Sequence, residues 1–326
     1  MNRSPRGKRN FKKGDAHLHA RKTVKFEFIH NHRHEHTIVK MCDVLGVSTS
    51  GYYLYLRRLE REETERERWN RQLDERIQFH FHDNLGTYGS PRIYKKITQE
   101  DGIQVSLKKV TNRMSELGLY AVPSPKFIHT TDSDHDQAVF KNVLNRNFQP
   151  EAPNKVWATD ITYIHTGEGF LYLNPILDLY SRRVISYAID DHMNHSLPLR
   201  ALNEALSKRQ PKHGWVHHSD RGSQYCSRNY LDALRQADAT ISMSRKANPY
   251  DNACVESFFA SLKKEYLYKW VFKTKAEAIQ AVQFYIEFYN RKRMHSSLDY
   301  ATPIEVEVAY MKAQKKDTTK DFTTSA

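Results

Sequence analysis

The chain has 326 residues and carries 51 lysines and arginines against 38 acidic residues, a formal net charge of +13. This excess indicates a polyanionic partner, with nucleic acid favoured over an anionic membrane surface. No apolar run approaches the roughly 20 residues of a membrane span. The basic opening segment also lacks the apolar stretch of a secretory signal, so we expect a cytoplasmic protein without a membrane partner. The length predicts two or three domains.

The cysteines and histidines do not form a pattern typical of a disulfide framework or a zinc site. The cysteines are odd in number and widely separated: Cys42, Cys226 and Cys254. Four histidines alternate with other residues before the first cysteine: His30, His32, His34 and His36. A spacing of two places these histidines on opposite flanks of a helix, and no Cys-x-x-Cys pair can complete a tetrahedral site. We therefore expect no zinc site and a reducing compartment.

The N-terminal part divides into a basic arm and a pair of helices. Residues 1–25 hold nine lysines and arginines and one acidic residue, which predicts a flexible arm that either lies along DNA phosphates or only aids solubility. Residues 26–58 are typical of a helix-turn-helix, because apolar residues recur at helical spacing in 38–45 and Ser48 can cap a second helix. Arg57 would point outward from that second helix and is a candidate DNA contact.

Residues 59–120 are predicted to form a second helical module. Helical periodicity recurs in the segments 70–82, 91–99 and 107–117, and Ser106 can cap the last of them. This last helix is basic on one side, which suits the DNA major groove, although small helical domains also mediate protein contacts. The candidate DNA contacts in this module are Arg92, Lys108, Lys109 and Arg113. Residues 121–150, with several prolines and an acidic patch, are predicted to be a linker.

Residues 151–312 show the alternation of strands and helices expected of an α/β domain. The predicted strands are 156–164, 170–179, 182–189, 214–218 and 240–243, and the predicted helices between them are 197–206 and 228–236. The first three strands are expected to form an antiparallel meander. Asp160 lies in the middle of the first strand, where an unpaired buried carboxylate is costly. Asp220 directly follows the fourth strand, at the edge where ligands gather in open α/β sheets, and Gly222 allows a sharp turn there.

A long helix is predicted after a mobile loop at residues 244–252. Its apolar stripe includes Val255, and Glu256 lies on an adjacent face that borders the core. Lys263 follows about two turns later on the same face as Glu256, so an acid and a base project from neighbouring turns. Residues 313–326 are predicted to be a flexible tail.

Three carboxylates on different elements form the set that metal-dependent phosphodiester chemistry requires. Such chemistry needs an activated nucleophile and neutralised charge at the phosphate, which two Mg²⁺ ions about 4 Å apart supply together. Magnesium prefers carboxylate oxygens, with water and substrate phosphate completing its coordination. We therefore predict that Asp160, Asp220 and Glu256 converge in space, bind two Mg²⁺ ions and are the catalytic residues.

The segments around these carboxylates resemble the acidic motifs of insertion-sequence transposases related to retroviral integrases. They are residues 157–164 (WATDITYI), 218–225 (HSDRGSQY), 248–253 (NPYDNA) and 256–259 (ESFF). Between Asp220 and Glu256 lie 35 residues, the spacing that marks the Asp-Asp-35-Glu group, whose bacterial representative is insertion sequence family three. Residues 86–93 (GTYGSPRI) and 289–298 (YNRKRMHSSL) also resemble segments of this family. The resemblance spans about residues 26–305.

The resemblance implies a fold and an activity. The fold is an α/β RNase H-like integrase catalytic core, a mixed five-stranded sheet flanked by helices, preceded by small helix-turn-helix modules. The activity is Mg²⁺-dependent cleavage that exposes a 3′ hydroxyl at the ends of an insertion sequence, followed by strand transfer, with Mn²⁺ able to substitute. Lys263, Arg293 and His295 are candidate contacts to terminal DNA, although Arg293 and His295 alternatively pack the last helix of the core.

The resemblance also implies partners. They are double-stranded DNA, both terminal repeats and target, and a second copy of the chain in a dimer or larger oligomer. The family's leucine-zipper segment is not visible, so the chain resembles the product of the downstream reading frame, and the upstream-frame protein is a further expected partner. A bacterial protein of this kind is expected to associate with the nucleoid.

Two departures from the family and several rival acids remain. Ala247 and Asp299 stand where the family usually has glycine. Four further acids lie near the proposed site: Asp178, Asp190, Asp191 and Asp251. Asp178 either orients a ligand or serves a turn or salt bridge, and Asp251 is predicted to cap the long helix.

One apparent motif is excluded, and two other functions are open to test. The residues 218–220 (His-Ser-Asp) are not a hydrolase triad, because neighbours on an extended chain point in alternating directions. A DNA-binding regulator of transposition with an idle core is the first alternative to a transposase. An RNase H-type nuclease without strand transfer is the second.

Overall fold

The computed structural model describes residues 22–121, 139–246 and 248–323, and the chain divides into two compact units between Leu73 and Asp74. The predicted basic arm up to residue 21 and the acidic part of the predicted linker lie outside the described residues. Among the described residues, no helix is long and apolar enough to cross a membrane.

The first unit contains three helices, α2 (Lys22–Asn31), α3 (Ile38–Leu45) and α4 (Thr49–Glu60). Their shared core consists of Ile29, Met41, Cys42, Leu45 and Tyr52. Gly46 ends α3 in the left-handed conformation (φ +61°), and the Ser48 hydroxyl accepts a hydrogen bond from the backbone N–H of Gly51 (3.1 Å). The predicted helix pair and its cap are therefore confirmed. The predicted arm is too long, because residues 22–25 belong to α2.

The second unit begins with the helical module. It contains α6 (Ser90–Gln99), α7 (Leu107–Glu116) and the C-terminal part of α5 (Glu65–Asp83), which crosses the division between the units. Pro91 lies in the first turn of α6, where its missing N–H costs nothing. The Ser106 hydroxyl accepts the backbone N–H of Lys109 (3.2 Å) and caps α7, as predicted.

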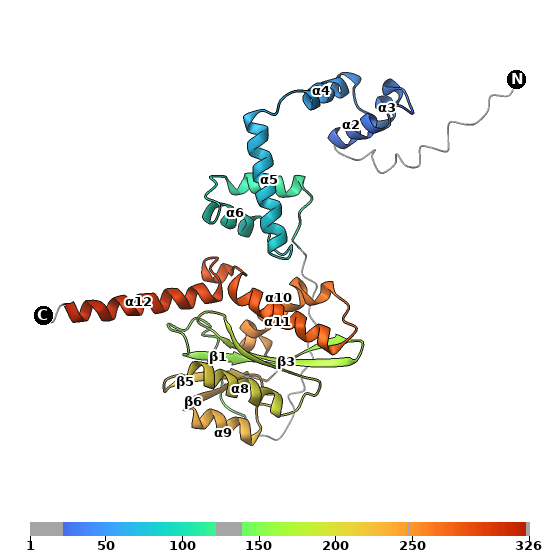
Figure 1. Cartoon of the computed structure of the whole chain (residues 1–326). Helices are drawn as coiled ribbons and strands as arrows, with labels where there is room; N and C mark the ends of the chain where they lie inside the picture. Colours follow the sequence, from blue (N-terminus) through green and yellow to red (C-terminus); the bar gives the residue numbers. More distant parts are fainter. Residues whose placement is uncertain (1–21, 122–138, 247, 324–326) are drawn as a thin grey trace. The chain divides into compact units, whose positions relative to one another are not determined.

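A mixed sheet of six strands forms the centre of the core (Figure 1). Its strands are β1 (Val156–Thr159), β2 (Thr162–Thr166), β3 (Gly169–Asp178), β4 (Val184–Asp190), β5 (Trp215–Ser219) and β6 (Ala239–Met243). Strands β2, β3 and β4 form the predicted antiparallel meander, whereas β1, β5 and β6 are parallel. Six strands replace the predicted five because the first predicted strand is broken at Asp160 and Ile161. Its two halves, β1 and β2, both pair with β3 on the edge opposite β4.

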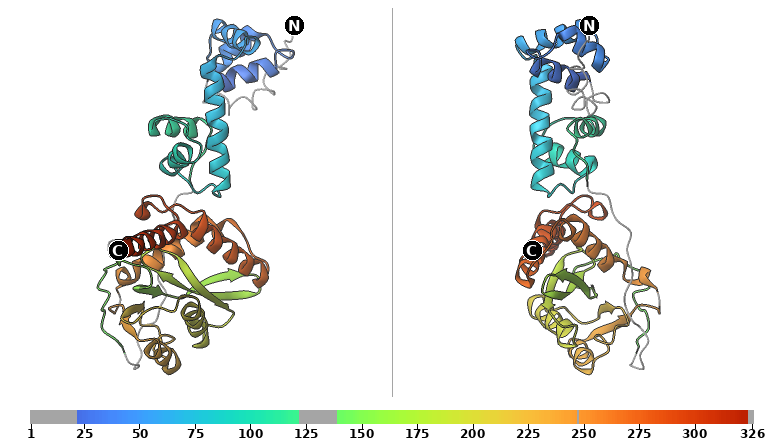
Figure 2. Two further views of the ribbon diagram at one scale, coloured as in Figure 1. Left: turned by 60° about the vertical axis from the view of Figure 1, so that its left-hand side comes forward. Right: turned by 90° about the vertical axis from the view of Figure 1, so that its right-hand side faces the viewer.

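Helices cover both faces of the sheet, so the core has three layers (Figures 1 and 2). Helices α10 (Ala253–Glu265) and α11 (Lys275–Arg291) pack on one face, and α8 (Ser196–Arg209) and α9 (Arg228–Gln236) pack on the other. Trp157 belongs to the α8 and α9 side and Ala158 to the α10 and α11 side, as alternation along β1 requires. The predicted α/β class is confirmed.

Two segments predicted to be flexible are part of the fold. Residues 139–148 of the predicted linker lie on the core, because Phe140, Leu144 and Phe148 pack into its apolar clusters. Helix α12 (Pro303–Thr323) continues through most of the predicted tail at 313–326. Three short 3-10 segments complete the core: η2 (Pro249–Asn252), η3 (Leu267–Lys269) and η4 (Ser296–Leu298).

Candidate active site

Asp160 stands at the break between β1 and β2. Its carboxylate Oδ1 accepts the backbone N–H of Ile161 (2.7 Å), and its backbone carbonyl accepts the side-chain amide of Asn174 from β3 (2.8 Å). The sequence predicts a continuous strand through Asp160. In the structure, the Asp160 side chain takes the backbone N–H of Ile161 and the Asn174 amide takes the Asp160 carbonyl, so the hydrogen-bond ladder of the sheet is interrupted here. The carboxylate therefore projects from the carboxyl end of β1.

Asp220 lies next to Asp160 in the sheet because β1 and β5 are parallel neighbours. Ala158 pairs with His218 in that ladder, so Asp160 and Asp220 each stand two residues beyond the same pair. One Asp220 carboxylate oxygen accepts the backbone N–H of Gly222 (2.9 Å). A Cβ at position 222 would come within 3.1 Å of that oxygen, so a larger residue would press on the Asp220 carboxylate.

Glu256 approaches the same region from the first turn of α10. Burial raises the pKa of Asp160 well above its usual value, and the negative charges of Asp220 and Glu256 raise it further, whereas Lys263 opposes the shift. The three predicted acids thus share one electrostatic environment. They do not form a tight cluster, because the group of three ligand-bearing side chains that falls within 4.8 Å in the described chain lies elsewhere.

Two buried amide side chains tie together the elements that carry the acids. Asn252, at the start of α10, donates a hydrogen bond to the backbone carbonyl of Thr159, next to Asp160 (3.0 Å). Asn174 donates to the Asp160 carbonyl and lies 2.7 Å from the hydroxyl of Tyr225, in the segment that follows β5. Neither amide was among the predicted site residues. The available signals were an asparagine inside an apolar strand and the second asparagine of the segment 248–253 (NPYDNA).

Lys263 is buried on α10 and lies within reach of the acids. Its ammonium group is 4.8 Å from the centre of the Tyr163 ring. Desolvation lowers the pKa of Lys263, and the negative charge of Asp160 opposes that shift. A lysine placed in this way offers the site a positive charge, and its contact with DNA stays a prediction.

Three of the predicted DNA contacts lie at or near the end of the core. Arg293 is buried and donates hydrogen bonds to both carboxylate oxygens of Glu265 (2.7 and 2.6 Å). His295 is buried and lies edge-on to the Tyr289 ring, with 4.6 Å between the ring centres. Both placements fit the core-packing alternative. Arg92 is half-buried and lines a cavity that Arg293 also lines.

The remaining predicted DNA contacts lie on the surfaces of the two helical parts. Arg57 and Lys108 are exposed, and Lys109 is half-buried. Arg113 forms a two-pronged ion pair with Asp74, in which its Nε lies 2.7 Å from a carboxylate oxygen. This ion pair joins α7 to α5, so Arg113 has a structural role in the module.

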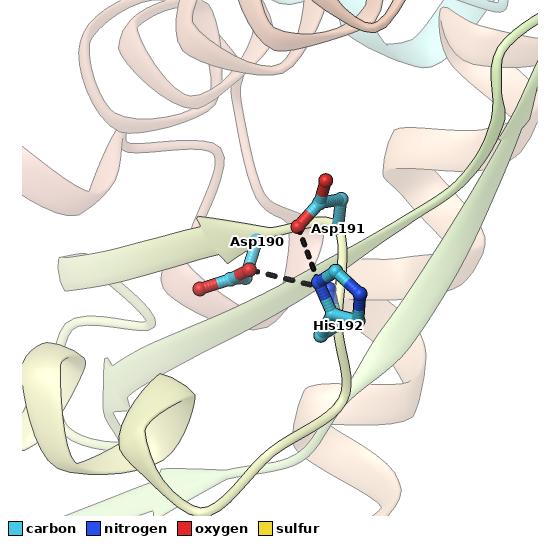
Figure 3. A group of neighbouring side chains, drawn as sticks. All are labelled: Asp190, Asp191 and His192. Carbon is cyan, nitrogen blue, oxygen red and sulfur yellow. Dashed lines mark hydrogen bonds and ion pairs between the residues drawn. The ribbon is translucent and has the colours of Figure 1, made fainter.

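A second group of possible metal ligands lies at the end of β4 (Figure 3). Asp190, Asp191 and His192 each offer one ligand atom, and these atoms lie within 4.8 Å of one another. Both carboxylates already have cationic partners, because Arg200 donates to Asp190 (2.6 Å) and Lys275 to Asp191 (3.1 Å). Exposed acids paired in this way need no metal, so this group is not a strong rival to the predicted triad.

Asp178 has the turn role that the sequence left open. It is fully buried at the end of β3 and accepts the backbone N–H groups of Asn154 (2.7 Å) and Tyr180 (2.9 Å). Burial raises the pKa of Asp178 to about 6, despite these two hydrogen bonds. The carboxylate therefore fixes the chain reversal after β3.

The predicted capping role of Asp251 is wrong. Asn252 occupies the N-cap position of α10, and the buried Asp251 carboxylate accepts hydrogen bonds from Arg245 (2.7 and 2.8 Å) and Arg146 (3.0 Å). These hydrogen bonds hold the pKa of Asp251 far below its usual value. Asp251 therefore attaches the residues before α10 to the segment that precedes β1, a contact between positions more than a hundred residues apart.

The two departures from the family pattern differ in what the structure says of them. Asp299 adopts the left-handed conformation (φ +50°), and so does Tyr300 (φ +66°). The position therefore has the backbone geometry that favours glycine, and aspartate tolerates it better than most residues. Ala247 lies outside the described residues.

Comparisons with protein families match three parts of the chain. Residues 150–249 and 237–303 match models described as an integrase core domain. Residues 67–127 match a model described as an HTH-like domain, which corresponds to the helical module.

Three relatives cover most of the chain. The transposase for insertion sequence element IS904 of Lactococcus lactis is 42% identical over 253 residues, 77% of this chain and 98% of the relative. The transposase InsF for insertion sequence IS3A of Escherichia coli K12 is 38% identical over 286 residues, 87% and 98%. A 31 kDa protein of insertion element IS600 of Shigella sonnei is 41% identical over 264 residues, 81% and 96%.

Among solved structures, similarity extends to the HTLV-2 integrase catalytic core domain in complex with magnesium. That chain is 17% identical, with a TM-score of 0.38, and the match covers 48% of this chain and 98% of the other. A simian T-cell lymphotropic virus intasome matches with 15% identity and a TM-score of 0.43, over 71% of this chain and 73% of the other.

Proposed function

Because the chain belongs to the IS3 group of insertion-sequence transposases, which carry an integrase core domain, we propose that Asp160, Asp220 and Glu256 perform its phosphodiester chemistry. Membership of this family makes the chain a DNA-binding polynucleotidyl transferase that acts in DNA transposition.

One observation carries this assignment. The parallel ladder between β1 and β5 places Asp160 and Asp220 at equivalent positions beyond the same residue pair. Glu256, on the helix that covers this face of the sheet, completes the set and adds to the repulsion on the Asp160 carboxylate. Asp160 and Asp220 thus lie at the carboxyl ends of two neighbouring strands, where ligands bind in open α/β sheets, and Glu256 adds a third acid from the first turn of α10.

The donor set fits divalent metal, with two Mg²⁺ ions as the expected complement and Mn²⁺ able to substitute. Carboxylate oxygens are the ligands that Mg²⁺ prefers, and mutually repelling carboxylates at one site favour a cation between them. A bound metal would neutralise charge on the phosphate and lower the pKa of the attacking water or hydroxyl.

The residues of the chain then have separate tasks. The three acids would hold the divalent metal against which the scissile phosphate lies, and Lys263 is placed to offset negative charge next to them. In the first step, water attacks the phosphorus at the end of the element, and the broken P–O bond leaves a free 3′ hydroxyl. In the second step, that 3′ oxygen attacks a target phosphodiester, so one phosphodiester bond forms as another breaks and no covalent bond to the protein is needed.

The proposal includes the partners. Double-stranded DNA, both terminal repeats and target, is the substrate, and two ends must be held together for joining. We therefore propose at least a dimer, with the upstream-frame protein of the same element as a further partner. Arg57 and Lys108 are proposed DNA contacts in the helical parts, which their exposure supports.

A strand-transfer assay with oligonucleotides that carry the ends of the element, in the presence of Mg²⁺, tests this function. Joined products support a transposase, cleavage alone a nuclease, and binding alone a regulator. Glu256→Gln should slow cleavage and joining by well over 100-fold. Loss of a residue that only hydrogen-bonds a metal ligand already costs about 10–100-fold in metal affinity or activity, and Glu256 is itself a proposed ligand. DNA affinity should stay unchanged.

The matched control is Asp191→Asn, which removes one acid from the exposed group at the end of β4. Its activity should equal that of the unaltered chain. Turnover retained by Glu256→Gln, or lost in Asp191→Asn with an intact fold, would contradict the assignment of the site.

A further inference from the structure

A cavity of about 290 Å³ lies between the helical module and α10, within the second unit. Its lining includes Arg92, Ser257, Ser261, Lys264, Glu265 and Arg293. Ser257, Ser261, Lys264 and Glu265 all belong to α10. They are spaced three to four residues apart, with Glu265 next to Lys264, so they lie on one side of that helix. The cavity is therefore a junction where the module, the helix that carries Glu256 and the end of the core meet.

Specific hydrogen bonds attach the module to the core beside this cavity. The Tyr88 hydroxyl accepts the backbone N–H of Met294 (2.7 Å) and donates to the backbone carbonyl of Lys292 (3.1 Å). Tyr88 is fully buried, and burial raises its pKa to about 12. The Lys269 ammonium also donates to the Leu85 carbonyl (2.6 Å). These hydrogen bonds from side chains to backbone groups thus join the module to the core at residues next in sequence to Thr87 and Arg293, which line the cavity.

The lining carries more positive than negative charge. It has three cations, Arg92, Lys264 and Arg293, and one carboxylate, Glu265. That carboxylate already accepts two hydrogen bonds from Arg293 and one from the Tyr285 hydroxyl (2.8 Å). Its charge is therefore compensated by Arg293, and the cavity keeps a net charge of about +2 together with two serine hydroxyls.

Arg92 is the side chain whose charge has the least compensation. Its guanidinium lies 5.3 Å from the centre of the Tyr88 ring, which orients it toward the cavity wall. Within the described parts of the chain, no carboxylate forms an ion pair with Arg92. Burial lowers the pKa of Arg92, and the neighbouring charge of Arg293 lowers it further, whereas the Glu265 carboxylate opposes the shift. Both oxygens of that carboxylate already accept hydrogen bonds from Arg293, so a further anion would stabilise the half-buried Arg92.

We propose that this cavity binds a backbone phosphate of the terminal DNA, with Arg92 as its main ligand and the α10 serines as hydrogen-bond donors. An arginine fork and hydroxyl groups are the donors that recognise phosphate oxygens. The inference rests on the proposed function, which brings DNA to the same helix, and adds a site outside the acidic triad.

The position of the cavity along α10 fits a DNA strand that enters the active site. Glu256 directly precedes Ser257, the first α10 residue of the cavity lining, and Glu265, the last, lies eight residues after Ser257. At about 1.5 Å per residue, the cavity lining starts beside Glu256 and extends roughly 12 Å along the helix. A phosphate held there would lie a few nucleotides at most from the scissile phosphate and would couple the DNA-binding module to the chemistry.

Binding of the full chain to end DNA with single methylphosphonate substitutions tests the proposal. Each substitution removes one phosphate charge near the cleavage site. In the unaltered chain, one position should lower affinity about tenfold. In Arg92→Gln, that position should have no further effect, overall affinity should fall about tenfold, and the slope of log K against log salt should decrease by about one.

Lys96→Gln is the matched control. It removes the same charge one turn further along α6, from a lysine already paired with Glu100. It should leave the salt slope and the methylphosphonate pattern unchanged. Ser261→Asp keeps Arg92 and places a negative charge in the cavity from the α10 side, so it should abolish the same phosphate sensitivity even if Arg92→Gln disturbs the fold.

Three results would overturn the proposal. One is that both cavity variants, Arg92→Gln and Ser261→Asp, keep the salt slope and the phosphate sensitivity of the unaltered chain. Another is that Lys96→Gln loses as much DNA affinity as Arg92→Gln. The third is that inorganic phosphate raises the thermal stability of the unaltered chain more than that of Arg92→Gln while DNA binding is equal in both, which would assign the cavity to free phosphate. A chain that binds DNA with the expected pattern but joins no ends would overturn the proposed chemistry and leave the cavity assignment supported.

Discussion

Replacement of Asn252 by alanine separates the positioning of Glu256 from the stability of the fold. The Asn252 amide is buried and joins the start of α10 to the Thr159 carbonyl, one residue before Asp160. Alanine keeps the helix but removes this connection between two of the three acids. We therefore expect Asn252→Ala to slow the chemistry far more than it weakens DNA binding.

The expected loss of stability in Asn252→Ala is small, whereas the expected loss of cleavage rate is large. Loss of one buried hydrogen bond, with its acceptor left without that partner, costs about 1–3 kcal/mol in the free energy of unfolding. A shift of about 1 Å in a catalytic group can cost about 100-fold in rate. The chain should thus remain folded at 25 °C, while single-turnover cleavage falls by about 10- to 100-fold.

Asn252→Asp sharpens the test because it has the same shape. The aspartate would place a carboxylate oxygen against the Thr159 carbonyl, so two acceptors would face each other 3.0 Å apart. Asn252→Asp should therefore be slower than Asn252→Ala, although it removes less volume. Single-turnover rates with Mg²⁺, DNA affinity and urea unfolding of both variants are the measurements. Equal cleavage rates for both variants and the unaltered chain would refute the positioning role.

Three other perturbations have expected outcomes. Tyr88→Phe should reduce the free energy of unfolding by about 1–3 kcal/mol, because two buried backbone groups lose their partner, and urea unfolding should show the loss. Gly222→Ala should lower the cleavage rate with little change in thermal stability, because its Cβ would push on the Asp220 carboxylate, and an unchanged rate would contradict this. Burial lowers the pKa of His217 to about 3, below its unfolded value near 6.5. The unfolded state therefore binds the extra proton, and stability should fall as pH decreases below about 6.5, by up to about 1.4 kcal/mol per unit. In urea unfolding between pH 7 and pH 5, a His217→Gln variant should lack the part of this pH-dependent loss of stability that His217 contributes.

The local sequence determined the helices and most strands. Helix caps such as Ser48 and Ser106 depend on contacts within three residues, so their pattern is visible in the chain itself. The acidic triad could be predicted because each acid stands in a motif with fixed spacing, and its catalytic role stays a prediction. The class of fold followed from the order of strands and helices, which needs no knowledge of their packing.

The tertiary structure decided what depends on partners distant in sequence. The break at Asp160 requires Asn174 from the neighbouring strand, and Asp251 binds Arg146 from the segment before the sheet instead of capping a helix. The sequence left Arg293 open between a DNA contact and a core-packing residue, and in the structure Glu265 and the core enclose it. A local pattern records the preference of a residue for a helix, strand or turn. It does not record which distant donor or acceptor will meet that residue, because only the folded chain brings the two together.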